Sequence, residues 1–255
     1  MPDTAPAPVP AGNARLLAVA ILASFIAFLD GSIVTVALPA IGTELGGGLA
    51  TQQWTVNAYL LTLGALILLA GSLSDMFGRL RVLRLGLLGF GAASLACALA
   101  WSPEVLIIAR ALQGMAGALL VPGSLALITT AYRDEARGRA VGQWTAWTGT
   151  AAIIGPLLGG VLVDWASWRW IFAVNVLPVA VTLLLSAGLR DSGTLRRMSL
   201  DIPGAALAVA GLAGSVYALI EQERRGWGHP GVVVPLAGGV AALVFFFLRE
   251  ARTRA

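Results

Sequence analysis

Two ionisable side chains lie in stretches that are otherwise apolar, and their type and position give them the greatest chemical potential. Asp30 interrupts the run ILASFIAFLDGSIVTVALPAI, and Arg110 lies in IIARALQGMAGALLVPGSLALI. An acid that faces lipid costs on the order of 3 kcal/mol, so such residues usually have a partner or a function. Asp30 is either a structural group paired across helices or a protonatable or substrate-facing carboxylate that lines an aqueous cavity. Arg110 either snorkels to the interface or packs against a neighbour or lines a cavity.

The residues after Arg110 favour the second alternative for it. Gln113 and Gly114 follow at positions i+3 and i+4, which places them on the same helix face as the arginine. An arginine close to an acid favours the charged form of that acid, and its withdrawal favours protonation. Asp30 and Arg110 are therefore candidates for a proton switch.

Other kinds of site are poorly supported by the composition. The chain has one cysteine, Cys97, and one histidine, His229. A single cysteine excludes an internal disulfide and a cluster of thiolate metal ligands. A zinc site or a histidine-based triad needs more partners than one histidine can have. Since no helical pair of catalytic acids is present either, we expect no enzyme, no metal and no cofactor.

The composition predicts an all-α polytopic membrane protein. Of the 255 residues, 58% are hydrophobic and 12% are charged, whereas a soluble domain carries about 25% charged residues. This balance argues against a soluble enzyme and against a nucleic-acid-binding domain. A membrane helix needs about 20 apolar residues, so the chain can hold eight spans with short loops. The expected helices cover approximately residues 16–41, 54–73, 82–101, 104–131, 138–163, 169–189, 202–222 and 231–248.

The positions of the arginines predict the orientation in the membrane. With the N-terminus in the cytoplasm, thirteen arginines fall on cytoplasmic segments and three on outer loops, which is a strong positive-inside bias. An even number of spans then leaves both termini in the cytoplasm, and we expect a multi-pass protein of the plasma membrane. Residues 1–14, rich in proline and alanine, are expected to form a disordered cytoplasmic tail.

Glycines and charges mark two further segments. The stretch GSLSDMFGRLRVL after the second span holds four residues that could latch neighbouring helices, namely Gly71, Asp75, Gly78 and Arg79. The alternative is an ordinary hairpin with cytoplasmic positive charge. The fifth span holds a kinking proline and glycines that allow close helix approach, namely Gly155, Pro156, Gly159 and Gly160. This segment is a bendable gate element, a closely packed helix, or both.

Together and in this order, these motifs resemble the major facilitator superfamily, in particular its fourteen-span drug:proton antiporter branch. The resemblance rests on FLDGSIVTVALPAI, GSLSDMFGRLRVL, RALQGMAGA and GPLLGG, and it covers about residues 14–250. A further similarity opens the sixth span, in Trp168, Arg169, Trp170, Phe172, Asn175 and Pro178. The resemblance implies a six-span N-terminal bundle over residues 15–190, followed by two additional spans over residues 191–255.

The resemblance also implies a function, which is export of small amphipathic or cationic compounds by proton antiport with alternating access, driven by the proton gradient. Asp30 would take up the proton, and Arg110 would tune that acid or relay protons. The stretch after span two would latch the inward-closed state, and the fifth span would bend and pack tightly against span two. Substrate contacts are expected from Asn57, Tyr59, Trp144 and Trp147.

The family fold needs two six-span halves, whereas the expected spans supply one half and two linker spans. The expected partners are therefore the lipid bilayer, a small-molecule substrate, and a missing C-terminal half or a second chain. The sequence is compatible with a fragment, a truncated gene product and a self-assembling half. The alternative function is a truncated membrane protein that does not transport but binds or regulates a partner transporter.

Overall fold

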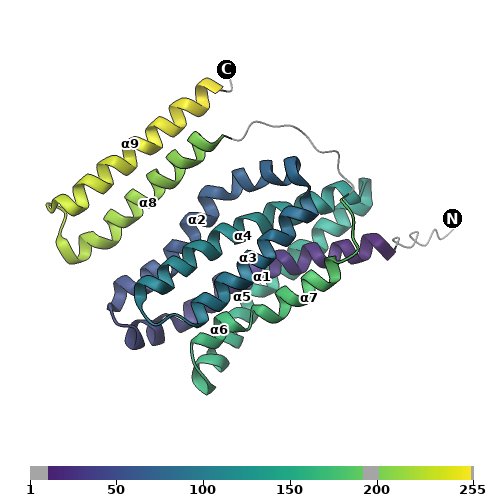
Figure 1. The fold of residues 1–255 in the computed structure, drawn as a ribbon, viewed down its shortest axis with the longest axis horizontal. Coiled ribbons are helices and arrows are strands. Elements are labelled where there is room, and N and C mark those ends of the chain that lie inside the picture. Colours follow the sequence, from purple (N-terminus) through teal and green to yellow (C-terminus); the bar gives the residue numbers. More distant parts are fainter. Residues whose placement is uncertain (1–10, 192–200, 254–255) are drawn as a thin grey trace.

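A computed structural model describes residues 11–191 and 201–253, and the regular elements in this part of the chain are all α-helices (Figure 1). In chain order they are α1 (Ala11–Glu44), α2 (Gly48–Phe77), α3 (Arg79–Ala98), α4 (Pro103–Ala131), α5 (Asp134–Trp165), α6 (Arg169–Ala173), α7 (Val176–Ser186), α8 (Ile202–Arg225) and α9 (Pro230–Thr253). Of the tail expected over residues 1–14, residues 1–10 lie outside the described residues, and α1 begins at Ala11.

The predicted all-α membrane architecture is confirmed. Within the described residues, seven helical segments are long and apolar enough to cross a membrane, and they include the broken segment Arg169–Ser186. The two parts of α2, Gly48–Ile67 and Leu69–Phe77, meet at 54° and add an eighth span if they cross together. The sixth expected helix is interrupted between α6 and α7 rather than continuous.

Glycines with positive φ angles make two of the short turns between spans. Gly46, Gly47 and Gly48 have φ angles of 81°, 78° and 55°, and Gly78 has a φ of 97° between α2 and α3. These angles lie in the region where a side chain strains the backbone. The short connections hold α1 beside α2 and α2 beside α3. These glycine turns therefore help to position the helices that carry the site.

α1 is the helix around which the bundle is organised, since it packs against α2, α4, α5 and α7. Two apolar clusters share it. One contains Ala27 with Leu87 and Phe90, and the other contains Ile33 with Phe172. Asp30 lies on α1 between the residues that belong to the two clusters, so the polar site is enclosed by packed apolar side chains.

α8 and α9 form a hairpin at one edge of the molecule, beside α2 (Figure 1). Their backbones approach so closely at Gly214 that a Cβ there would lie 2.7 Å from the carbonyl oxygen of Pro235. Asp201 accepts a hydrogen bond from the backbone N–H of Gly204 at 2.9 Å and pairs with Arg249 at 2.5 Å. Hydrogen bonding from Arg249, with that of Gly204, holds the pKa of the Asp201 carboxyl below its usual range.

Acid is expected to loosen this hairpin at the Asp201 end. Because the pKa of Asp201 is lowered in the folded chain, the carboxylate stabilises the fold at neutral pH, and that contribution is lost as the pH falls through the lowered pKa. Asp201→Asn keeps a capping side chain but removes the ion pair. Amide protection factors at the start of α8 should therefore be lower than in the wild type at neutral pH. Glu223→Gln, exposed on the same helix, is the control, and equal protection in all three proteins would contradict the prediction.

Candidate functional site

The carboxylate of Asp30 accepts hydrogen bonds from three side chains at the centre of the bundle. Its Oδ2 accepts from Nη1 of Arg110 at 2.5 Å, and its Oδ1 accepts from Nε2 of Gln113 at 2.8 Å and from Nδ2 of Asn175 at 2.7 Å. The exposed fraction of Asp30 is 0% and that of Arg110 is 1%. The charged carboxylate is thus fully withdrawn from solvent and is compensated by an ion pair and two amide donors.

Arg110 is fixed by more than the carboxylate. Its Nε donates to the carbonyl oxygen of Thr55 at 2.9 Å, and its Nη1 also donates to Oε1 of Gln113 at 2.8 Å. The guanidinium lies 4.4 Å from the ring centroid of Tyr59, a distance suited to a cation–π contact. Arg110 therefore packs within the bundle, and the snorkelling alternative does not apply.

A second layer of side chains surrounds these partners. The hydroxyl of Ser94 donates to the carbonyl oxygen of Phe172 at 2.8 Å and accepts from Gln113 at 3.2 Å and from Asn175 at 3.1 Å. The thiol of Cys97 donates to Oε1 of Gln113 at 3.5 Å. The network joins α1, α2, α3, α4 and the break between α6 and α7.

Asn175 reaches this network from the turn between α6 and α7. Val174 and Asn175 form a turn between α6 and α7, and Pro178 has no N–H to donate to the carbonyl oxygen of Val174. The side chain of Asn175 points from this turn to Asp30. Sequence reasoning noted Asn175 and Pro178 only as part of a motif and gave Ser94 and Thr55 no role.

A cavity of about 680 Å³ lies beside the network between α1, α2, α4 and α5. Phe28, Tyr59, Trp144, Thr145 and Thr148 contribute to its wall. Asp30 is not among the lining residues, so in this conformation it is a group paired across helices and not a cavity-lining carboxylate. Tyr59 belongs to both the cavity and the polar network, because it lines the cavity and its ring contacts the guanidinium of Arg110.

Two of the four expected substrate contacts border this cavity and two do not. Tyr59 and Trp144 line it, and Nε1 of Trp144 donates to Oγ of Ser24 at 3.1 Å. Asn57 is outside the cavity lining, and Trp147 is exposed on another face of α5. The helical turn explains the difference, because Trp144 and Thr148 share a face at i and i+4 that Trp147 does not share.

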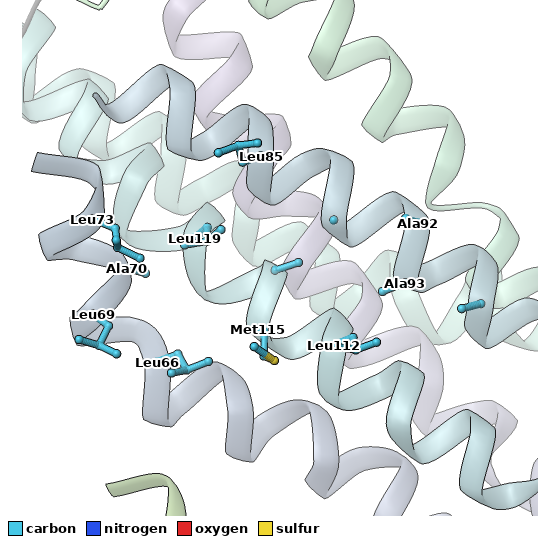
Figure 2. A pocket seen from close by; sticks show the side chains of 13 residues that line it. Leu66, Leu69, Ala70, Leu73, Leu85, Ala92, Ala93, Leu112, Met115 and Leu119 are labelled. Atoms are coloured by element: carbon cyan, nitrogen blue, oxygen red, sulfur yellow. The ribbon is translucent and has the colours of Figure 1, made fainter. Parts of the chain in front are cut away.

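A second hollow of about 660 Å³ opens between α2, α3 and α4, and its lining is wholly apolar (Figure 2). Figure 2 shows leucines from all three helices around it, with Met115 of α4 facing the hollow. Neither a hydroxyl, an amide nor a charge lines it. Of these two cavities, the one beside Tyr59 therefore combines aromatic surface with hydrogen-bonding side chains.

The glycines of α5 pack against α1, which corrects the expectation that they pack against span two. A Cβ at Gly155 would clash with Oγ of Ser32, and a Cβ at Gly159 would lie 3.0 Å from the carbonyl oxygen of Ile33. Ser32 also donates to the carbonyl oxygen of Ala151 at 2.8 Å. By contrast, Pro156 is exposed and a Cβ at Gly160 would meet no atom within 4 Å. Only Gly155 and Gly159 make the close approach.

Gly114 of α4 allows a comparable close approach, between α4 and α2. A Cβ at Gly114 would clash with the carbonyl oxygen of Tyr59 and with Oγ1 of Thr62. Thr62 donates to the carbonyl oxygen of Ala111 at 2.8 Å, which is a hydrogen bond between α2 and α4. Gly114 therefore brings Arg110 and Gln113 to the centre by letting α4 lie directly against α2.

Three of the four expected latch residues form one structure at the junction of α2 and α3. Arg79 pairs with Asp75 at 2.8 Å and donates to the carbonyl oxygen of Ala126 on α4 at 2.9 Å. Asp191, which sequence reasoning missed, accepts from the backbone N–H of Leu80 at 2.8 Å and so caps α3.

Glycine is required at one of the latch positions. The φ of Gly78 is 97°, which residues with a side chain rarely adopt, and a Cβ there would also lie 2.5 Å from Oδ2 of Asp191. Gly71 makes no such approach, because a Cβ there would meet no atom within 4 Å.

Within the described residues, no group of three or more His, Cys, Asp and Glu side chains could hold a metal ion. The polar network is instead built from one ion pair, two amides, a hydroxyl and a thiol. Such a set can hold a proton or release it, and it can shift hydrogen bonds between neighbouring helices.

Comparisons with known proteins relate the whole bundle to one family. The family model of the Major Facilitator Superfamily matches residues 20–251. The chain is 44% identical over 241 residues to a puromycin resistance protein of Streptomyces alboniger, covering 93% of this chain and 48% of that protein. It is 40% identical over 241 residues to the cephamycin export protein CmcT of Amycolatopsis lactamdurans, covering 92% and 49%. The chain spans about half the length of the curated relatives that it matches.

Solved structures show the same fold. A peptide transporter, POT, in complex with sulfate aligns with a TM-score of 0.67 at 17% identity, over 96% of this chain and 52% of that one. A bacterial homologue of the human lysosomal transporter Spinster, inward-facing and occupied, aligns with a TM-score of 0.62 at 20% identity, over 94% and 60%. At these identities the likeness concerns the fold alone.

Removing one partner of the central ion pair is expected to destabilise the bundle more than removing both. Asp30→Leu leaves a buried guanidinium and Arg110→Met leaves a buried carboxylate, and each should cost about 3–5 kcal/mol. The double variant should unfold at a temperature closer to that of the wild type. Thermal unfolding of the chain in lipid nanodiscs measures the difference, and strictly additive losses would contradict direct coupling of the two residues.

The close approach of α5 to α1 can be tested with two glycines of one helix. Gly155→Leu should destabilise the bundle by about 1–3 kcal/mol because the new side chain overlaps Ser32. Gly160→Leu is the matched control and should unfold like the wild type, since its Cβ meets open space. The same nanodisc unfolding experiment applies, and equal losses in the two variants would refute the packing argument.

Proposed function

Because the chain belongs to the Major Facilitator Superfamily, we propose that it forms the N-terminal half of an exporter. This exporter moves small amphipathic or cationic compounds by proton antiport with alternating access. The observation that carries the proposal is the fully buried Asp30–Arg110 pair, which lies behind the wall of a cavity of about 680 Å³.

The buried pair supplies a means of coupling to protons. In the state described, Nη1 of Arg110 contacts Oδ2 of Asp30 at 2.5 Å. A proton on Asp30 cancels that attraction and leaves Arg110 with the carbonyl oxygen of Thr55 and with Gln113. Release of the ion pair then loosens α4 from α1. Moving one charge through 100 mV is worth about 2.3 kcal/mol, which shifts a two-state equilibrium more than tenfold.

The cavity suits an amphipathic compound. Phe28, Tyr59 and Trp144 offer aromatic surface, while Thr145 and Thr148 offer hydroxyl groups. Aromatic rings also attract cations. The names of the relatives refer to puromycin resistance and cephamycin export, and they support antibiotic-like compounds as the substrate class.

The arginine bias supports a cytoplasmic location for both termini, in a plasma membrane. The junction of α2 and α3, with Asp75, Gly78 and Arg79, then lies on the cytoplasmic side and latches the bundle there. The second six-span bundle comes from a longer form of the same protein or from another chain. α8 and α9 act as the linker spans, because they pack on each other and on α2 at one edge of the bundle.

The test is proton-driven efflux from cells that lack their own drug exporters and express the complete gene. Asp30→Asn should reduce efflux by at least about tenfold, because the neutral amide cannot take up a proton. Asp164→Asn, which alters an exposed acid on α5, should leave efflux unchanged. If Asp30→Asn retains full proton-coupled efflux at wild-type protein levels, the proposal is wrong. If neither variant nor wild type transports, the non-transporting partner-binding role takes its place.

A further inference from the structure

Asn175 is a partner of Asp30 that has an unused hydrogen-bond acceptor. Its Nδ2 donates to Oδ1 of Asp30 at 2.7 Å and to Oγ of Ser94 at 3.1 Å. Its Oδ1 is buried and has no hydrogen-bond partner within the described residues, although the whole residue has an exposed fraction of 0%. Buried polar atoms nearly always have a partner, so an unpaired oxygen beside the central acid needs an explanation.

A protonated Asp30 would need an acceptor that the present arrangement does not offer. The carboxylate faces three donors, and its protonated form becomes a donor itself. Arg110 has no acceptor atom. Oε1 of Gln113 already accepts from Arg110 at 2.8 Å and from Cys97 at 3.5 Å. The unpaired Oδ1 belongs to Asn175, whose amide nitrogen is already in contact with the acid.

A half-turn of the Asn175 amide would supply that acceptor. Rotation about the Cβ–Cγ bond exchanges Oδ1 and Nδ2, and this torsion has a broad, roughly two-fold energy profile. The oxygen would then occupy the present nitrogen position, 2.7 Å from Oδ1 of Asp30, which is an ordinary O–H···O distance. The hydroxyl of Ser94 has one hydrogen, so it bonds to the rotated oxygen only by turning that hydrogen away from the carbonyl oxygen of Phe172.

We propose that Asn175 positions Asp30 in both of its protonation states, the amide nitrogen holding the carboxylate and the amide oxygen accepting the proton of the acid. The inference rests on the proposed function, in which Asp30 takes up the proton. The other charged or titratable groups in this network are Arg110 of α4, Tyr59 of α2 and Cys97 of α3. None of them takes the place of the amide: Arg110 has no acceptor atom, the hydroxyl of Tyr59 donates to the carbonyl oxygen of Ala27, and the thiol of Cys97 contacts Gln113.

Infrared difference spectroscopy tests the proposal on the chain itself, in lipid nanodiscs brought from neutral to acid pH. The carboxylic acid C=O band that disappears in Asp30→Asn belongs to Asp30. In Asn175→Leu, a side chain of similar size, the acid loses its acceptor and this band should move to higher wavenumber. Thr182→Val is the control because it removes a buried hydrogen bond of 2.7 Å on α7 outside the network, and its band should stay in place.

A second measurement leaves Asn175 intact, so it does not depend on the folding of a variant at that position. The sequence has three asparagines, and replacing Asn13 and Asn57 by glutamine leaves Asn175 as the single site for asparagine labelled with 13C in its side-chain amide. The labelled C=O band should shift to lower wavenumber when Asp30 is protonated, because the oxygen then accepts a hydrogen bond. In an Asp30→Leu background, which adds no asparagine, the shift should vanish.

The outcomes separate this inference from the proposed function. If Asp30 titrates but neither the acid band of Asn175→Leu nor the labelled amide band moves, Asn175 does not accept the proton of the acid, and the inference is wrong while proton uptake by Asp30 stands. If no acid band depends on Asp30 between neutral and acid pH, Asp30 does not take up a proton, and both proposals fail together.

Discussion

The need to compensate one buried carboxylate fixes how the central helices lie. Asp30 has no solvent to hydrate its charge, so donors must reach it from neighbouring helices. Arg110 and Gln113 come from α4, and Asn175 comes from the break between α6 and α7. Because Arg110 is also bound to the carbonyl oxygen of Thr55 on α2, a small shift of any of these helices breaks a buried polar contact.

The close approach that this network demands depends on small residues. In a lipid environment apolar burial gives little drive for helices to associate, so packing at short range and hydrogen bonds must supply it. Gly114 lets α4 lie against α2 at the level of Tyr59, and Gly155 lets α5 lie against α1 at Ser32. Both contacts are close in sequence to a residue of the ion pair, with Ser32 two positions from Asp30 and Gly114 four from Arg110. The glycines therefore allow the close helix approach that the buried polar contacts require.

The residues that lie within the spans could be predicted from the sequence, whereas the direction in which each side chain points could not. Eight apolar runs predicted the helices, and an acid and an arginine within such runs indicated the two central residues. Which face of a helix meets which neighbour is set by packing over the whole bundle. For that reason the sequence did not show that Trp147 and Trp144 lie on different faces of α5. The partner of α5 was also misassigned, since small residues show where a helix can be approached closely but not by what.

Asn175 shows a different limit of sequence reasoning. A polar amide near the expected start of a helix resembles an ordinary interfacial residue, and Asn175 lies where the sixth span is interrupted. Pro178 was the available signal, because a proline three residues later removes a backbone donor and favours such a break. That signal predicts a distortion but gives no distance to a residue 145 positions earlier in the chain.

The position of Tyr59 constrains how a substrate and a proton could be coupled under the proposed function. Its ring borders the cavity on one side and contacts the guanidinium of Arg110 at 4.4 Å on the other, while its hydroxyl donates to the carbonyl oxygen of Ala27 at 3.1 Å. Tyr59 lines the cavity whereas Asp30 does not, so a compound in the cavity can contact Tyr59 but not the carboxylate. Direct competition of substrate and proton for that carboxylate would require the cavity wall to move first. Under the proposed function, coupling would then be conformational: a compound that displaces Tyr59 would weaken the hold on Arg110, and a proton on Asp30 would release the same arginine from the other side.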